Sequence, residues 1–197
     1  MFKNKLLLIT TSFALFYSEI AYSHSFEGMN GFYDGLSHPV LGLDHFLAMI
    51  SVGIISAQIG GRAIWTVPST FVFIMLIGGL IGVYFSGINH VIIEYGIILS
   101  VIFLGLGITI EKKIPLKIIM VFVGIFGFFH GTAHGLEMPN AANPFYFALG
   151  FITGTATLHI FGVIIGYFSI KTKITSLILK LTGMVFAIYG VYLILTL

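Results

Sequence analysis

Charged side chains are scarce in this sequence. Asp, Glu, Lys and Arg make up 8% of the 197 residues, and the mean hydropathy is +1.09. Ordinary soluble domains carry about 25% charged residues, so this chain has too few to cover a surface that faces water. The deficit excludes a soluble globular protein and predicts that most of the surface faces the hydrocarbon of a lipid bilayer.

Cysteine is absent altogether. Its absence excludes disulfide bonds, thiolate nucleophiles, iron–sulfur clusters and Cys-ligated zinc. Any metal must therefore be bound by His, carboxylate, Met or backbone groups. Large basic clusters are missing as well, because the formal net charge is +2 and the largest group is Lys112 and Lys113 with Lys117 nearby. This pattern excludes nucleic acid as a partner.

The short alternating strands of a membrane β-barrel are also missing. Long apolar runs predict instead an all-α, polytopic membrane bundle. We expect six transmembrane helices of about 20 residues or more, over residues 36–58, 64–86, 90–110, 114–136, 145–169 and 174–196. Only short loops connect them, so residues 24–197 are expected to form a single transmembrane domain.

The first 23 residues have the features of a secretory signal peptide. Lys3 and Lys5 precede an apolar stretch, and the small-residue end at 21–23 is typical of a cleavage site. We predict a cleavable signal peptide over 1–23 and a mature chain that begins at His24. The alternative is an uncleaved first helix, since residues 6–22 are just long enough to span.

The distribution of basic residues predicts the orientation. All basic residues of the mature chain lie in, or at the helix ends beside, the loops after the first, third and fifth spans: Arg62, Lys112, Lys113, Lys117, Lys171, Lys173 and Lys180. Short loops rich in Lys and Arg stay in the cytoplasm. Both mature termini are therefore expected outside.

Several ionisable residues lie within or at the ends of these apolar spans. Such a residue costs at least about 2.5–3.5 kcal/mol on insertion scales and is a functional candidate by default. The candidate metal ligands are His38, Asp44, His45, Glu94, His130, His134 and Glu137. His24 at the new N-terminus is a further candidate, as is His159, whose alternative role is a hydrogen bond between helices.

The spacing of these residues predicts which of them share a helix face. His130, His134 and Glu137 follow an i, i+4, i+7 pattern, so they share one helix face, and two imidazoles at this spacing can bind one ion. That face adjoins glycines at small-xxx-small spacing, including Gly127 and Gly131, which predict close helix packing. The face is therefore expected to point into the bundle.

In the first span, the predicted separation of two histidines is too large for both to bind one ion. His38 and His45 would lie roughly 10 Å apart along an unbroken helix, whereas metal–ligand bonds are about 2 Å long. Either Pro39 and Gly42 distort the segment, with His38 near the helix cap and Pro39 in the first turn, or the two histidines are successive stops for an ion.

The expected depths of the candidates favour passage of an ion. Counted at about 1.5 Å per residue from the outer surface, they form a ladder from His38 and His134, through Glu94 and His130, to Asp44 with His45, and last His159. Conduction needs sites that bind the ion strongly enough for it to enter and weakly enough for it to leave. A graded series therefore predicts transport rather than storage.

Imidazole and carboxylate without thiolate suit Ni²⁺, Co²⁺ or Zn²⁺ and disfavour Cu(I). A permease for a divalent metal is the leading hypothesis, and it makes the chain no enzyme. One alternative is an intramembrane zinc-dependent hydrolase, in which Glu137 or Glu94 would be the base. Another is a bis-His haem membrane protein, with His45 and His130 as the axial pair.

The sequence resembles the HupE/UreJ family of bacterial nickel permeases over essentially its whole length. Three stretches carry the resemblance: His38-Pro39-x-x-Gly42-x-Asp44-His45-x-x-Ala48-Met49, then Gly60-Gly61-Arg62-Ala63-x-Trp65 with Pro68, and Phe129-His130-Gly131-x-Ala133-His134-Gly135-x-Glu137. The first and third are specific. These motifs do not separate nickel from cobalt.

The resemblance implies uptake of Ni²⁺, or Co²⁺, as the transported ion across a bacterial inner membrane, with periplasmic mature termini and no permanently bound cofactor. It implies a supply of nickel to hydrogenase or urease maturation. It assigns His38, Asp44, His45, His134 and Glu137 as motif residues and adds Phe71 and Glu94. Three spans in each half also allow an inverted 3+3 repeat, and a homo-oligomer is compatible with all of this.

Overall fold

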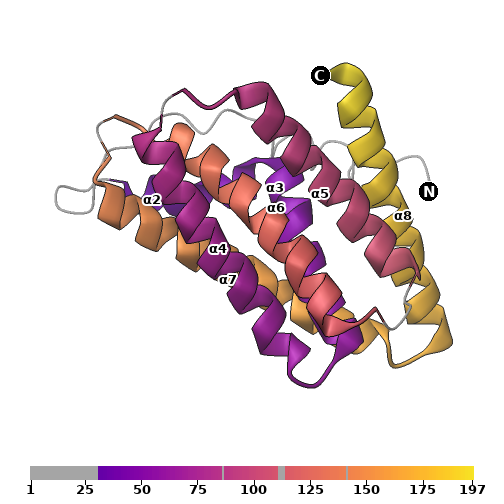
Figure 1. Cartoon of the computed structure of the whole chain (residues 1–197). Coiled ribbons are helices and arrows are strands. Elements are labelled where there is room, and N and C mark those ends of the chain that lie inside the picture. Colours follow the sequence, from indigo (N-terminus) through magenta and orange to yellow (C-terminus); the bar gives the residue numbers. More distant parts are fainter. Residues whose placement is uncertain (1–30, 86, 111–113, 141) are drawn as a thin grey trace, which may run out of the picture.

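The computed structural model describes residues 31–85, 87–110, 114–140 and 142–197, and in these ranges the chain is entirely helical (Figure 1). The helices are α2 (Phe32–Leu41), α3 (Leu43–Ile59), α4 (Ala63–Tyr84), α5 (His90–Ile110), α6 (Leu116–Leu136), α7 (Pro144–Ser169) and α8 (Lys173–Thr196). The predicted all-α class is confirmed. The predicted signal peptide and His24 lie outside the described residues.

Helices α4 to α8 are each long and apolar enough to cross a membrane, whereas the first predicted span is two helices. α2 and α3 meet the same criterion only as a pair, which is bent by 84°. Gly35 of α2 packs on the Phe147 carbonyl near the start of α7, and Gly53 of α3 packs on the His159 carbonyl further along. The bent pair thus follows α7 along its length, and we count it as one crossing.

The break falls at Gly42. This residue ends α2 and caps the N-terminus of α3, with an extended backbone at φ −78° and ψ 112°. Of the two alternatives for the first span, the distortion is therefore observed, but the predicted positions of His38 and Pro39 within it were wrong. α2 begins at Phe32, so Pro39 lies well inside it and His38 lies in its last turn. Proline is typical of the first turn of a helix, so Pro39 predicts a helix start, whereas α2 begins about two turns earlier.

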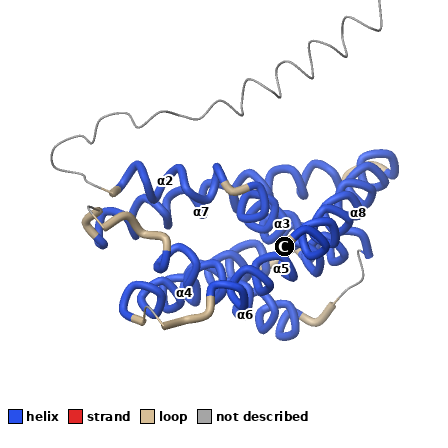
Figure 2. The backbone as a smooth tube through the Cα atoms, turned by 90° about the horizontal axis from the view of Figure 1, so that it is seen from above, coloured by secondary structure: helices blue, strands red, loops and turns tan. Residues whose placement is uncertain are grey.

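The packing pairs helices from the two halves of the chain. α4 packs most extensively on α6. Both α2 and α3 pack on α7, and α5 packs on α8. Viewed from above, α2 and α7 lie on one side of the bundle and α4 and α6 on the other (Figure 2). The first half consists of α2 with α3, then α4 and α5, and the second half consists of α6, α7 and α8 in the same order. If each helix is replaced by its counterpart, the α4–α6 pair becomes the α7–α3 pair and the α5–α8 pair stays the same, as an internal repeat requires. The halves still differ, because α6 has no break that corresponds to Gly42.

The bundle buries a set of polar residues within an apolar core and exposes large apolar side chains on its surface. Its buried polar residues are His45, Ser51, Ser56, Ser100, His130, Thr132, His134, Thr155 and His159, whereas large apolar side chains such as Leu80, Ile188 and Leu195 are exposed. Burying imidazoles while exposing leucines is unfavourable in water but suits a lipid environment. The candidate functional groups therefore lie in the interior.

The α4–α6 contact depends on glycine, as the small-xxx-small spacing predicted. Gly78 of α4 packs against the Phe128 carbonyl, and Gly131 of α6 packs against the Met75 carbonyl. A Cβ atom at Gly78 would also come within 3.0 Å of the Thr132 nitrogen. Backbone atoms cannot yield as a flexible side chain can, so there is no space for a methyl group at Gly78.

We expect Gly78→Ala to lower the free energy of unfolding by about 1–3 kcal/mol, the usual effect of overpacking. Gly79→Ala is the matched control, because a Cβ there would meet the Gly131 carbonyl at an ordinary 3.5 Å. Apparent melting temperatures in detergent would compare the two variants. Equal melting temperatures would contradict the tight α4–α6 seam.

Candidate metal site

Four imidazoles from three helices meet inside the bundle. The ring centroids of His38 and His134 are 4.6 Å apart, those of His134 and His45 are 4.7 Å apart, and those of His45 and His130 are 4.8 Å apart. We call these four residues the histidine cluster. The bend at Gly42 brings the His38 and His45 rings to 6.1 Å, so they need not lie a full 10 Å apart as on a straight helix.

The open end of the cluster is formed by His38 and Glu137. His38 Nε2 lies 2.8 Å from Glu137 Oε2, and the two side chains are 32% and 40% exposed. Ligand atoms of His38, His134 and Glu137 all lie within 4.8 Å of one another, close enough to hold one metal ion. The hydrogen bond with His38 holds the pKa of Glu137 below its usual value, so its carboxylate remains available to a cation.

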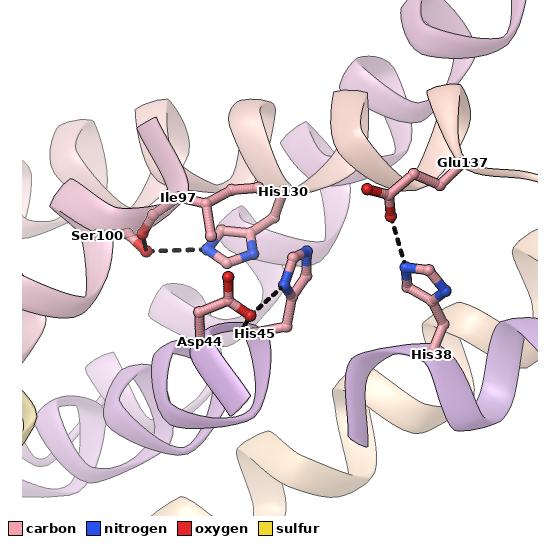
Figure 3. A network of polar contacts seen from close by, with 7 residues as sticks. All are labelled: His38, Asp44, His45, Ile97, Ser100, His130 and Glu137. Carbon is pink, nitrogen blue, oxygen red and sulfur yellow. Dashed lines mark hydrogen bonds and ion pairs between the residues drawn. The ribbon is translucent and has the colours of Figure 1, made fainter. Parts of the chain in front are cut away.

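Asp44 positions the ring beside it. Its Oδ1 accepts a hydrogen bond from the His45 backbone nitrogen at 2.8 Å and lies 2.9 Å from His45 Nδ1 (Figure 3). Because a carboxylate accepts, Nδ1 carries the proton and Nε2 keeps its lone pair. Nε2 is buried and has no hydrogen-bond partner in the described ranges. In this geometry Asp44 orients the His45 imidazole.

Ser100 of α5 does the same for His130, and the sequence did not reveal it. The Ser100 hydroxyl donates to the Ile97 carbonyl at 2.6 Å and lies 2.9 Å from His130 Nε2 (Figure 3). With its proton committed to Ile97, Ser100 accepts from Nε2–H, and His130 Nδ1 keeps its lone pair. That atom is buried and without a partner among the described residues. The available signal was a lone serine within an apolar span.

His134 lies at the centre of the cluster. Its side chain is 1% exposed and packs on the ring of Phe151 with a centroid distance of 4.1 Å. Neither ring nitrogen has a hydrogen-bond partner in the part of the chain that the structure describes. Each buried polar atom left unsatisfied costs about 1–3 kcal/mol. The site therefore holds several unused nitrogen atoms, as a metal site without its ion would.

Three other candidates lie apart from the cluster. Glu94 is partly buried on α5 and forms no hydrogen bond or ion pair with the described residues. Phe71 of α4 is fully buried, and its ring centroid is 5.6 Å from that of His130 and 5.2 Å from that of His159. The Phe71 ring thus contacts both His130 of the cluster and His159.

The geometry bears on the haem alternative. The rings of His45 and His130 meet edge to face at an interplanar angle of 88°. A haem iron with two axial histidines requires a porphyrin between the two rings. Rings in direct contact leave no space for it, so this pair does not form a haem site in the observed conformation.

Comparison with known proteins points to one family. A family model described as HupE / UreJ protein matches residues 12–193. Protein HupE of Rhizobium leguminosarum bv. viciae is 41% identical over 156 residues, which cover 79% of this chain and 81% of that protein. No solved structure matches. The residues matched by the family model include the whole histidine cluster and Glu137.

Proposed function

Because the chain belongs to the HupE/UreJ family, we propose that it is a bacterial inner-membrane permease that takes up divalent nickel, or cobalt, for hydrogenase or urease maturation. The observation that carries this proposal is the histidine cluster, in which consecutive rings lead from a half-exposed mouth to a fully buried imidazole. The ion is the substrate, and the protein catalyses no reaction.

The ion enters at His38, His134 and Glu137. It then passes to His45 Nε2 and His130 Nδ1, the two buried atoms whose lone pairs Asp44 and Ser100 leave free. Carboxylate and hydroxyl partners commonly orient metal-bound histidines in this way. Neutral imidazole suits nickel and cobalt without holding them as tightly as thiolate would.

The spread of the ligands favours transport over hydrolysis. A catalytic zinc site gathers three protein ligands around one ion and leaves one position open for water. His38, His134 and Glu137 could form one such group at the mouth, but further unused nitrogens lie beyond it, on His45 of α3 and His130 of α6. Successive sites of this kind let an ion move from one to the next.

Partly buried Glu94 has a different role in this proposal. It lies one turn into α5, and its electrostatic neighbours include Asp44 and Glu137. Three carboxylates at one end of the bundle create a negative potential that raises the local concentration of cations. Glu94 thus attracts the ion without being required as a direct ligand.

Uptake of radiolabelled Ni²⁺ tests the proposed function. In cells that lack other nickel importers, the chain is expected to give saturable uptake that excess Co²⁺ suppresses more strongly than excess Zn²⁺. The control is the same strain carrying an empty vector. Uptake no higher than in this control would contradict the proposal.

The orientation is tested separately, and the cysteine-free sequence makes the test direct. We expect Gly87→Cys to react with a membrane-impermeant thiol reagent in intact cells and Lys171→Cys to react only after the membrane is opened. Both positions are exposed, and they lie in loops at opposite ends of the spans. The positive-inside rule places the loop of Lys171 in the cytoplasm. The reverse labelling pattern would overturn the direction of transport.

A further inference from the structure

The row of rings does not end with the histidine cluster. Beyond His130 it continues through Phe71, at 5.6 Å, to His159 of α7, at 5.2 Å from Phe71. His159 lies where α3 and α7 are in closest contact, since Gly53 packs on its carbonyl oxygen. A continuous series of contacting rings therefore connects the exposed mouth with an imidazole in the core of the bundle.

His159 has no structural partner to explain its presence. Its side chain is 2% exposed, and neither ring nitrogen has a hydrogen-bond partner in the described ranges. Two unsatisfied buried polar atoms cost about 1–3 kcal/mol each, and the hydrogen bond between helices considered as its alternative role is not formed. An apolar residue would fill this position at no such expense. The imidazole is therefore a group held ready for a ligand.

A second donor lies one helical turn from His159. The Thr155 hydroxyl, four residues earlier on the same face of α7, lies 3.8 Å from the sulfur of Met75. Met75 is four residues after Phe71 on the facing helix α4 and is fully buried. Two side-chain contacts thus join α4 and α7: Phe71 contacts His159, and Met75 contacts Thr155. Met75 thus lies one helical turn from His159 on the side of the histidine cluster, since Gly131, the neighbour of His130, packs on its carbonyl oxygen.

From these contacts we propose that His159 is a second binding station for the transported divalent cation, and that the Phe71 ring closes the path between this station and the histidine cluster. The inference rests on the proposed function. Phe71 has no lone pair to offer an ion, so the ion passes only when this ring turns aside. A station with a single imidazole binds loosely, which allows release on the far side.

Equilibrium dialysis of the full-length protein in lipid nanodiscs tests the station, with Co²⁺ alone as the probe. We expect the wild-type chain to bind one more Co²⁺ at millimolar metal than His159→Leu does. Nickel uptake in cells is expected to fall at least tenfold in His159→Leu, while the half-saturating concentration, which the histidine cluster sets, changes less than twofold. Thr157→Ala is the matched control, because its exposed hydroxyl bonds only to the Thr153 carbonyl of its own helix.

His159→Gln is the second variant, since it keeps the size and polarity of the side chain if His159→Leu does not fold. The proposal would be overturned if the wild type and the folded variant bound the same number of Co²⁺ ions and took up nickel at the same rate. A wild-type chain that binds a single Co²⁺ at millimolar metal would overturn it without any variant. If the wild type binds the extra ion but imports no nickel, the permease proposal fails while the station stands.

Discussion

Replacing His134 by alanine should abolish nickel uptake while leaving most of the protein in the membrane. The His134 ring lies between those of His38 and His45, at 4.6 and 4.7 Å, so its removal opens a gap between the mouth and the interior. Both of its nitrogens lack a partner within the described residues. The substitution therefore breaks no hydrogen bond there, and the Gly127 and Gly131 contacts with α4 remain.

Uptake of radiolabelled Ni²⁺, divided by the abundance of the protein in membranes, measures this effect. His90→Ala is the matched control, because His90 is an exposed histidine at the start of α5, away from the cluster. It should retain uptake close to that of the wild type. A parallel loss of abundance and uptake in His134→Ala would show instead that the imidazole has a structural role.

The adjacent residues Asp44 and His45 should respond very differently to substitution. His45 supplies the lone pair of Nε2, so His45→Ala is expected to be inactive at any nickel concentration. Asp44 acts through the His45 ring, which its Oδ1 contacts at 2.9 Å. Loss of such an orienting partner commonly lowers metal affinity by about 10–100-fold. Asp44→Asn should therefore shift the half-saturating nickel concentration upward and recover transport at high metal.

Uptake curves over a wide range of nickel concentrations separate these two outcomes. Asn keeps the shape of Asp and one acceptor oxygen, so it retains part of the contact with His45. Full activity of His45→Ala would remove α3 from the metal path. An Asp44→Asn variant that stays inactive at saturating nickel would assign Asp44 to direct binding rather than to orientation.

The helix positions were predictable because bilayer thickness sets the length of an apolar helix. The predicted span 90–110 coincides with α5, and 64–86 differs from α4 by two residues at most at either end. Segments of this kind need no knowledge of their neighbours. Likewise, the shared face of His130 and His134 follows from helix periodicity alone.

The parts that escaped prediction depend on contacts between distant segments. Gly42 marked a distortion, but the 84° bend is set by the packing of α2 and α3 on α7. Ser100 is 30 positions from His130, and no local pattern links the two. The place of Phe71 between His130 and His159 likewise arises only when α4, α6 and α7 come together.

The break at Gly42 also has an electrical consequence. A helix carries about half a positive charge at its N-terminus and half a negative charge at its C-terminus, and this break places one end of each kind beside the histidine cluster. The amide end of α3 would repel a divalent cation, but Asp44 lies in its first turn and offsets that charge. The carbonyl end of α2, where His38 lies in the last turn, attracts the cation. A straight helix with the same side chains would have neither end at this place, so the bend itself makes the cluster more favourable to a positive ion.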